Sequence, residues 1–499
     1  MRLFHHGAHG RHIENAGTFM TEKNNLFING SWVAPKGGEW IKVENPATKA
    51  VVAEVAKGGQ ADVDAAVSAA KSAFIGWSRR MATERADYIH ALKDLVKRDK
   101  EKLAAIITSE MGKPLKEARI EVDFAIGLLR FAAENVLRLQ GEIIPGSSPE
   151  EKILIDRVPL GVIGAITAWN FPLALCARKI GPAVAAGNTI VVKPHELTPL
   201  ACLHLAKLVE EAKIPHGVIN VVTGDGKDVG VPLVAHKDIK LITMTGSTPA
   251  GKKIMAAASE TLKEVRLELG GKAPFMVMED ADIDRAADAA VTARFNNAGQ
   301  VCTCNERTYI HEAVYDKFVQ KVREKIEALK VGLPTDPSTD MGPKVSEDEL
   351  NKVHEMVEHA VRQGARLAIG GKRLTGGVYD KGYFYAPTLL TDVTQDMDIV
   401  HNEVFGPVMS LIRVKDFDQA IAWANDCRYG LSAYLFTNDL SRILRMTRDL
   451  EFGEVYVNRP GGEAPQGFHH GYKESGLGGE DGQHGMEAYV QTKTIYLNA

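Results

Sequence analysis

The sequence predicts an α/β protein of two or three domains built around parallel sheets. Two observations carry this prediction. Short β-branched runs alternate with helical stretches from Gly161 onward, and the same alternation returns after Asp280. Buried strands separated by helices of this length are typical of a parallel sheet covered on both faces. In addition, a chain of 499 residues is too long for one ordinary domain.

The elements that precede this alternation are of two kinds. The segment LFINGSWV, residues 26–33, indicates two short strands that turn at Asn29-Gly30. From residue 62 to about residue 139 the sequence is rich in Ala and Leu, with apolar residues three and four apart. This spacing indicates helices.

The predicted first sheet is made of five short runs separated by helices. The strand-like runs span residues 161–167, 189–192, 217–222, 240–245 and 265–269. The helical segments begin near residues 171, 199, 227 and 249. Because a ligand of such a sheet lies at the carboxyl ends of its strands, the residues at those ends are the candidates for function.

The predicted second unit follows the same pattern. It contains a helix at 281–296, a strand at 306–312 and helices near 315–329 and 346–363. Two further segments, residues 152–160 and 488–499, alternate like strands but lie outside both units. We interpret them as an arm that pairs with itself or with another subunit.

Composition and charge exclude several classes of partner. Hydrophobic residues make up 45% of the chain and charged residues 25%, which is typical of a globular protein. The formal net charge is -4, and no basic stripe indicates nucleic acid. The longest apolar stretches have the length of a strand, far short of a membrane span. We therefore expect neither a nucleic-acid nor a membrane partner.

The five cysteines are odd in number and scattered, so they form no disulfide framework. A reducing, cytoplasmic compartment is the simpler interpretation. Cys302 and Cys304 are spaced C-x-C, but no second Cys/His pair with metal spacing lies nearby, and we expect no metal site. Residues 1–22 are interpreted as a disordered N-terminal extension, because they carry scattered histidines and because Met20 opens a segment that looks like an ordinary start.

Two glycine-containing turns are candidates for binding phosphate. The segment MTGSTPAG, residues 244–251, follows a strand, turns at Gly246 and opens a helix with free amides. Such a helix start can hold a pyrophosphate. The segment GDGKDVG, residues 224–230, is a weaker candidate, since a plain turn that feeds a helix explains it as well.

Two residues are candidates for catalysis, each with a structural alternative. Cys302 follows a helix in the loop NNAGQVCTC. A loop thiol near backbone amides can have its pKa lowered and act as a nucleophile, or it can be a small buried hydrophobic residue. Glu268 ends the alternating segment VRLE and precedes Gly270 and Gly271. It is either a general base or a member of a buried ion pair.

Polar residues also follow two other predicted strands. Asn170, in TAWNFP, lies where a strand ends and a helix begins. Its amide N–H can serve as an oxyanion donor in a cleft, or Asn170 can cap the helix. Lys193 and Glu196 follow the next strand in VVKPHE, and a surface ion pair is their structural alternative.

The ordered set of motifs resembles the aldehyde dehydrogenase superfamily. The motifs are TAWNFP, VVKPHELTP, MTGSTPAG, LELGGKAP, NNAGQVC, EVFGPV and GYKESGLGGEDG, in that order along the chain. The resemblance runs from about residue 26 to the C-terminus, and a chance match over seven ordered motifs is negligible.

The resemblance implies roles for the catalytic residues. Cys302 is the expected nucleophile, which forms a thiohemiacetal and then a thioester with the aldehyde. Asn170 joins the backbone N–H of Cys302 in an oxyanion hole. Glu268 is the expected general base that activates water to hydrolyse the thioester, and it separates this chain from the CoA-acylating members of the superfamily, which lack this glutamate.

The resemblance also implies NAD as the cofactor. Lys193 and Glu196 are expected at the adenosine ribose, and Glu403 of EVFGPV at the nicotinamide ribose. Phe405 is expected beside the nicotinamide. The remaining cofactor residues are those expected at the pyrophosphate, namely Gly246, Ser247 and Gly251.

The implied architecture is a three-part fold with a Rossmann-like NAD domain, an α/β catalytic domain and a small β oligomerisation arm. We assign residues 23–143 and 162–269 to the first, 270–486 to the second, and 144–161 with 487–499 to the arm. The superfamily forms dimers or tetramers, and we expect a homo-oligomer of one of these sizes.

The segment GEAPQGFHHGYKESG is similar to the lactaldehyde and glycolaldehyde dehydrogenases of bacteria within this superfamily. That similarity places Glu463, His469 and Arg178 in the aldehyde pocket, although PGGEAP replaces a more aromatic stretch. A small 2-hydroxyaldehyde is therefore the expected substrate, unless these residues only shape the loop. The alternatives are a semialdehyde such as succinate semialdehyde, for which Arg178 or His469 would bind the distal carboxylate, and a non-catalytic protein that reuses the fold.

Overall fold

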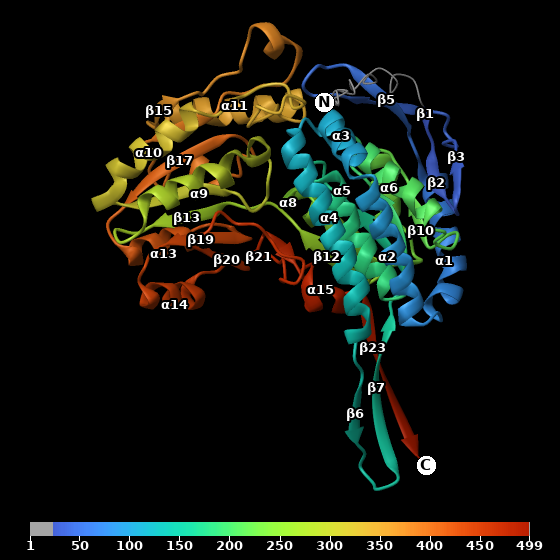
Figure 1. Cartoon of the computed structure of the whole chain (residues 1–499). Helices are drawn as coiled ribbons and strands as arrows, with labels where there is room; N and C mark the ends of the chain where they lie inside the picture. The colour runs from blue at the N-terminus through green and yellow to red at the C-terminus, as the bar shows by residue number, and fades with distance from the viewer. Residues whose placement is uncertain (1–22, 499) are drawn as a thin grey trace, which may run out of the picture.

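The structure, a computed structural model, describes residues 23–498. The predicted extension of residues 1–22 and the last residue, Ala499, lie outside the described residues. Two sheet-and-helix units lie side by side, and a long β-ribbon projects from one of them (Figure 1).

An eight-stranded sheet forms the centre of the first unit, with the strand order β22-β12-β11-β8-β9-β10-β2-β3. The strands are β2 (Leu26–Ile28), β3 (Ser31–Val33), β8 (Val162–Ile166), β9 (Thr189–Lys193), β10 (Ile219–Val221), β11 (Ile239–Thr245), β12 (Glu264–Glu268) and β22 (Gly476–Leu477). The five central strands, β12 to β10 in this order, are parallel. The strand runs and the parallel sheet predicted from the alternation are confirmed.

Helices cover both faces of this sheet. They are α1 (Gln60–Ser78), α2 (Ala82–Arg98), α3 (Lys100–Met111), α4 (Leu115–Asn135), α5 (Pro172–Ala185), α6 (Leu200–Glu211), α7 (Val231–Ala235) and α8 (Thr248–Ser259). Helices α2 to α6 share one hydrophobic core with the sheet, and α1, α7 and α8 share another on its other face. The predicted helical stretch is broken at Gly112, whose φ of +81° ends α3, and Pro114 precedes α4.

The second unit is built on a seven-stranded sheet in the order β15-β16-β17-β14-β13-β19-β20. The strands are β13 (Ala273–Val277), β14 (Asn305–His311), β15 (Arg366–Ile369), β16 (Thr388–Thr391), β17 (Val408–Val414), β19 (Ser432–Phe436) and β20 (Glu454–Val457). Helices α9 (Ile283–Phe295) and α10 (Tyr315–Glu327) pack on one face. Helices α11 (Glu347–Arg362), α13 (Phe417–Asn425) and α14 (Leu440–Asp449) pack on the other. Only β14 among these strands had a predicted counterpart.

The ribbon consists of β6 (Glu142–Pro145), β7 (Glu151–Pro159) and β23 (Val490–Asn498). Strands β7 and β23 pair antiparallel along their full lengths, from Val490 opposite Pro159 to Asn498 opposite Glu151. The two outlying segments therefore pair with each other within one chain. Large apolar side chains of the ribbon remain exposed at several positions, including Ile143 of β6 and Tyr496 of β23.

The last part of the chain returns to the first unit. Strand β22 pairs antiparallel with β12, and α15 (Gly482–Glu487) packs against α4 and α5. The domain boundaries assigned above stay predictions, but residues 476–487 make these contacts with the first unit. The smaller elements are β1 (Lys23–Asn24), β4 (Trp40–Glu44), β5 (Val51–Ala56), α12 (Asp398–His401), β18 (Tyr429–Gly430) and β21 (Tyr472–Lys473).

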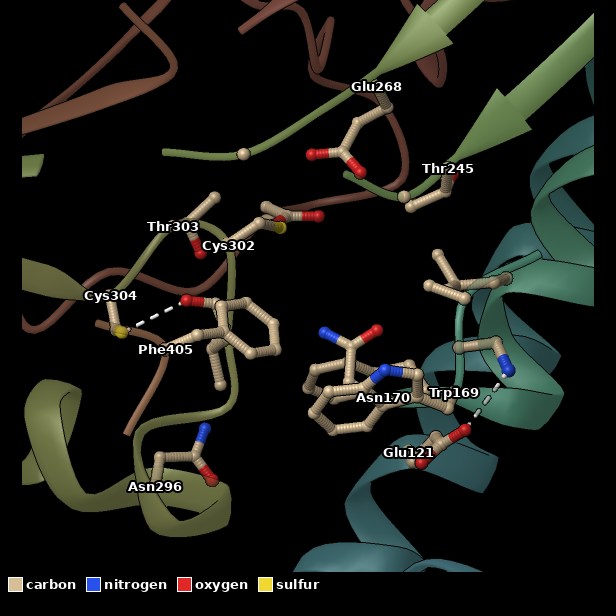
Figure 2. A pocket seen from close by; sticks show the side chains of 18 of the residues that line it. Glu121, Trp169, Asn170, Thr245, Glu268, Asn296, Cys302, Thr303, Cys304 and Phe405 are labelled. Atoms are coloured by element: carbon tan, nitrogen blue, oxygen red, sulfur yellow. Dashed lines mark hydrogen bonds between the residues drawn. The ribbon is translucent and has the colours of Figure 1, made fainter. Parts of the chain in front are cut away.

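The carboxyl ends of β11 and β12 place polar residues in a cavity. Figure 2 shows Thr245 and Glu268 at the ends of these neighbouring strands. The two residues are opposite each other in the parallel register. This is the edge of the sheet at which the sequence placed the candidates for function.

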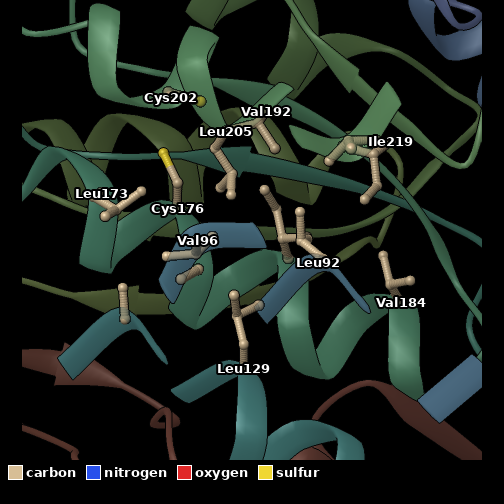
Figure 3. Close-up of a cluster of buried hydrophobic side chains, with 14 of the residues drawn as sticks. Leu92, Val96, Leu129, Leu173, Cys176, Val184, Val192, Cys202, Leu205 and Ile219 are labelled. Atoms are coloured by element: carbon tan, nitrogen blue, oxygen red, sulfur yellow. The ribbon is translucent and has the colours of Figure 1, made fainter. Parts of the chain in front are cut away.

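The core of the first unit also contains two of the cysteines. Cys176 of α5 and Cys202 of α6 lie among Leu, Val and Ile side chains from the helices and the sheet (Figure 3), and both are fully buried. These two thiols act as small hydrophobic residues. All five cysteines are free thiols. Within residues 23–498, no helix has the length and apolar character needed to cross a membrane.

Candidate active site

Residues from both units line a cavity of about 370 Å³. Figure 2 shows Glu268, Cys302 and Asn170 around it, each from a different segment of the chain. The predicted site residues among its lining are Asn170, Arg178, Gly246, Ser247, Glu268, Cys302, Glu403, Phe405 and Glu463. The fold therefore brings together nine of the thirteen residues that the sequence singled out.

The loop that carries Cys302 is held rigidly. Three consecutive residues, Asn297, Ala298 and Gly299, have φ between +49° and +72°. A Cβ on Gly299 would lie 2.2 Å from the carbonyl oxygen of Gly406, so only glycine fits there. The buried guanidinium of Arg294 donates to the carbonyl oxygen of Gly299 at 2.9 Å. These contacts fix the conformation of the loop and thereby the position of Cys302 at the cavity.

The two neighbouring thiols of this loop differ. Cys302 is half-buried, whereas Cys304 is buried and its Sγ donates to the carbonyl oxygen of Val301 at 2.9 Å. Burial raises the pKa of Cys304 to about 11. Burial, together with the charge of Glu268, also raises the pKa of Cys302 well above its usual value, while His469 opposes the shift. The lowered pKa that a loop thiol can have is therefore not found at Cys302.

Glu268 ends β12 as a buried carboxylate without a hydrogen bond on Oε1. Its Oε1 lies 3.5 Å from Nε2 of His469, which is not among the residues that line the cavity. One donor atom each from Glu268, Cys302 and His469 lie within 4.8 Å of one another. A carboxylate this close to the thiol can accept a proton from it or from a water between them.

Asn170 lies against the loop of Cys302. Its Nδ2 donates to the carbonyl oxygen of Gln300 at 3.1 Å. A primary amide has two N–H groups, so this bond orients the side chain and uses one of them. Asn170 does not cap α5, because the N-cap position is Phe171. The helix-cap alternative for Asn170 is therefore wrong.

The predicted substrate residues form a buried charged cluster. Nη2 of Arg178 pairs with Glu463 and also with Asp481, the latter at 2.8 Å. Although burial opposes it, the charges of His469 and Arg178 lower the pKa of Glu463 to about 2. Burial raises the pKa of Asp481 to about 7. Arg178 thus already has carboxylate partners within the chain.

The predicted cofactor residues occupy two neighbouring places. Lys193 ends β9, and its Nζ lies 3.1 Å from Glu196 outside the cavity lining. Lys193 is buried, so the pair is not the surface ion pair of the structural alternative. Ser247 is the N-cap residue of α8, and Gly246 precedes it. Gly251 lies in the first turn of that helix, where a Cβ would meet the side chain of Leu269 at 2.6 Å.

Glu403 and Phe405 approach the cavity from the second unit. Oε1 of Glu403 accepts a hydrogen bond from the N–H of Gly271 at 2.8 Å. Burial and the neighbouring Glu306 raise the pKa of Glu403 to about 7. The Phe405 ring packs edge-on against Trp169, with 5.4 Å between the ring centroids.

The turn GDGKDVG, in contrast, forms a single π-helical turn that leads into α7.

A family comparison accounts for this constellation. The model described as the aldehyde dehydrogenase family matches residues 32–495, nearly the whole chain.

The chain belongs to the aldehyde dehydrogenase family.

Individual relatives are similar over the same length. A 3,6-anhydro-alpha-L-galactose dehydrogenase from Vibrio sp. (strain EJY3) is 47% identical over 95% of this chain and 98% of its own. The crystal structure of lactaldehyde dehydrogenase from Escherichia coli has a TM-score of 0.93 at 42% identity, and covers 96% of this chain and 99% of that chain. The structure of a 3,6-anhydro-L-galactose dehydrogenase in complex with NAP, the phosphorylated cofactor NADP, has a TM-score of 0.94 at 46% identity. It covers 96% of this chain and 100% of that chain.

These similarities confirm the predicted fold class and the enzyme class. The chain is an oxidoreductase that acts on aldehydes, and its family uses NAD or NADP.

Two buried carboxylates that support the site of this dehydrogenase were missed in the sequence. Glu121 of α4 pairs with Lys113 at 2.6 Å and accepts from the N–H of Leu173 at the start of α5. Glu306 pairs with Lys272 at 2.5 Å and accepts from the N–H of Phe405 at 2.8 Å. Both hold segments that carry predicted site residues. No local signal reveals them, since a charged residue in a helix or strand is expected at the surface.

Proposed function

We propose that this dehydrogenase oxidises a small 2-hydroxyaldehyde to its carboxylic acid through a thioester on Cys302, with NAD as the hydride acceptor. One observation carries the proposal: Cys302, Glu268 and Asn170 converge on a single cavity. The intact set of three also argues against a non-catalytic protein that reuses the fold. The direct test is the formation of NADH when a small aldehyde is added.

The chain's own groups account for each chemical step. The Cys302 thiolate adds to the aldehyde carbon, and the second N–H of Asn170 and the backbone N–H of Cys302 would stabilise the oxyanion that forms. When bound, NAD supplies the hydride acceptor at this point. The resulting thioester is then attacked by a water from which Glu268 takes a proton, and the acid leaves as Cys302 recovers its thiolate.

The residues around the cavity fit a dinucleotide. The start of α8 presents free backbone amides beside Gly246 and Ser247, a suitable environment for a pyrophosphate. A Cβ at Gly270 would lie 2.7 Å from Oε2 of Glu403, so the glycine leaves that carboxylate room beside the cavity. Lys193 and Glu196 would hold the adenosine ribose, and Glu403 the ribose next to the nicotinamide, with Phe405 beside that ring.

We expect NAD to be preferred over NADP. His195 and Lys193 lower the pKa of Glu196 although burial opposes this, so Glu196 is ionised at neutral pH. Its charge repels a 2′-phosphate and accepts hydrogen bonds from ribose hydroxyls. The kcat/KM for NAD should exceed that for NADP by about tenfold or more, since about 1.4 kcal/mol of repulsion suffices.

The matched measurement compares Glu196→Gln with Glu358→Gln, which removes an exposed carboxylate of α11. The NAD preference should fall in the first variant and stay in the second. Equal kcat/KM for both cofactors in the unmodified enzyme would contradict the assignment of NAD.

The charges around the pocket support a hydroxyaldehyde more than a semialdehyde. Arg178 is already paired with Glu463 and Asp481, so it offers no free cation to a distal carboxylate. Glu463 provides an acceptor for a substrate hydroxyl. The relatives are named for 3,6-anhydrogalactose and lactaldehyde. Each of these aldehydes carries a hydroxyl on the carbon next to the aldehyde carbon. A panel of these two with glycolaldehyde and succinate semialdehyde tests the choice, and the highest kcat/KM for succinate semialdehyde would overturn it.

We predict that Glu463→Ala selectively impairs hydroxyaldehydes. A hydroxyl that loses its buried partner costs roughly 1–3 kcal/mol. The kcat/KM for glycolaldehyde should fall about five- to hundred-fold, while that for acetaldehyde, which has no hydroxyl, falls much less. An equal loss for both aldehydes would mean that Glu463 only shapes the loop. His469 does not line the cavity, so His469→Ala should lower kcat/KM for both aldehydes alike.

We further propose that the β-ribbon joins subunits into a homodimer or homotetramer. Its exposed apolar side chains, Ile143 and Tyr496 among them, support this role. A mass from light scattering that equals one chain would contradict it. Localisation in the cytoplasm stays a prediction.

A further inference from the structure

The side chain of His469 lies between two carboxylates, those of Glu454 and Glu463, and the pair formed by Cys302 and Glu268. Its Nδ1 is 3.2 Å from Oε1 of Glu454 and 3.9 Å from Oε1 of Glu463. Its Nε2 is 3.5 Å from Oε1 of Glu268, and the sulfur of Cys302 belongs to the same compact group. Only 1% of the His469 side chain is exposed. The ring thus has acidic groups on one side and the thiol with Glu268 on the other.

The hydrogen-bonding of this ring is incomplete. Within residues 23–498, neither ring nitrogen of His469 has a hydrogen-bond partner of good geometry. The same is true of Oε1 of Glu268. A buried polar group without a partner is costly, and the structure must compensate that cost. A ring protonated on both nitrogens achieves this, because it becomes a cation surrounded by carboxylates.

The charged groups that face the ring come from three segments. They are Glu268 of β12, Glu454 of β20 and Glu463 of the loop after β20. Arg178, the cation behind Glu463, is balanced by Glu463 and Asp481. Burial alone lowers the pKa of His469, but Glu463 and Glu454 raise it well above its usual value. The two carboxylates therefore favour the protonated, positively charged ring.

We propose that His469 is a positioning residue that stabilises the thiolate of Cys302 through its imidazolium ring, which Glu454 holds from the far side. The proposal rests on the proposed function only in taking Cys302 as the nucleophile. The thiol loses its proton to solvent, and the proton on His469 stays in place. In this way the cation offsets the burial and the charge of Glu268, both of which favour the neutral thiol.

The backbone around His469 makes a side-chain substitution feasible. The N–H of His469 donates to the carbonyl oxygen of Glu480 at 2.9 Å, and the N–H of Glu480 donates back at 2.7 Å. Neither bond involves the imidazole. The variant His469→Gln should therefore keep the path of the chain while it removes the charge.

The test is the rate at which iodoacetamide alkylates Cys302 between about pH 6 and pH 10, a range that spans ordinary thiol pKa values. Peptide mass spectrometry separates Cys302 from the other cysteines. A chelator is present, because thiol, imidazole and carboxylate are also a donor set for zinc. His469→Gln should move the midpoint up by about one pH unit or more, which means an about tenfold lower rate near pH 8.

Two carboxylate variants complete the experiment. Glu454→Gln should move the midpoint in the same direction by a smaller amount, because the ring loses one of its anchors. Glu451→Gln removes a surface carboxylate that pairs with Lys473, and it should leave the midpoint unchanged. If His469→Gln does not fold, as judged by thermal unfolding, Glu454→Gln carries the test.

An unchanged midpoint in a folded His469→Gln, or in Glu454→Gln when the former does not fold, would overturn the proposal. A loss confined to KM for hydroxyaldehydes, with normal alkylation, would likewise leave His469 as a substrate residue only. If the proposed function is wrong, Cys302→Ala will still oxidise the aldehyde. That outcome is independent of the alkylation measurements, which follow Cys302 in the unmodified enzyme and in the His469 and Glu454 variants.

Discussion

Replacing Cys302 with alanine is expected to abolish aldehyde oxidation while NAD binding is retained. The nucleophile forms the covalent intermediate through which the whole reaction passes, and its removal should lower kcat by at least about 10³-fold. The residues proposed to bind the cofactor should keep their positions, since alanine fits where the half-buried thiol lies. Steady-state NADH formation and NAD binding by calorimetry measure the two properties separately.

Cys304→Ala is the matched control for this variant. Its thiol is buried, bonded to the carbonyl oxygen of Val301, and has a pKa raised to about 11 by burial. Although Cys304 also lines the cavity, its thiol is therefore not ionised near neutral pH, and the variant should keep most of the activity. Equal losses in the two variants would mean that the nucleophile has been assigned wrongly.

The second large effect is expected for Glu268→Gln. Without a general base, hydrolysis of the thioester should slow by about 10²-fold or more. The steps before hydrolysis do not need the carboxylate once the thiol is ionised. Stopped-flow mixing with aldehyde and NAD should therefore show a fast burst of NADH close to the concentration of sites, followed by slow turnover.

The pH dependence of the burst gives this variant a second readout. The charge of Glu268 raises the pKa of Cys302, so its removal should lower that pKa and shift the rise of the burst rate to lower pH. Thiolate is the deprotonated form, which is present above its pKa. Loss of the burst at every pH would assign Glu268 an earlier role, as the base that ionises Cys302.

Much of the first unit could be predicted because its evidence is local. Each of β8 to β11 is a short run of mainly apolar and β-branched residues, a composition typical of parallel strands with helices on both faces, whereas β12 alternates apolar and charged residues. Asn170, Lys193, Gly246 and Glu268 follow or end these runs. Such residues can be expected at one edge of the sheet even when the strand order is unknown, because parallel strands end on the same side.

The second sheet was harder to predict from the sequence. Strand β13 is a run of only five residues, Ala273–Val277, that begins soon after the paired glycines and has no period that separates strand from helix. The strands after residue 363 are also short, and their partners lie far away along the chain. Strand β19, for example, pairs with β13, more than 150 residues earlier.

The sequence by itself determined the family and the α/β alternation and predicted the roles of Cys302, Glu268 and Asn170, because each depends on residues that are neighbours in the chain. Only the tertiary structure decided their electrostatics. The pKa of Cys302 is raised by burial and by the charge of Glu268 beside it, and Arg178 is paired with carboxylates that follow some 300 residues later. The position of His469 between Glu454 and Cys302 was likewise decided only by the tertiary structure. Charges act through distance and burial, and neither quantity can be read from separation along the sequence.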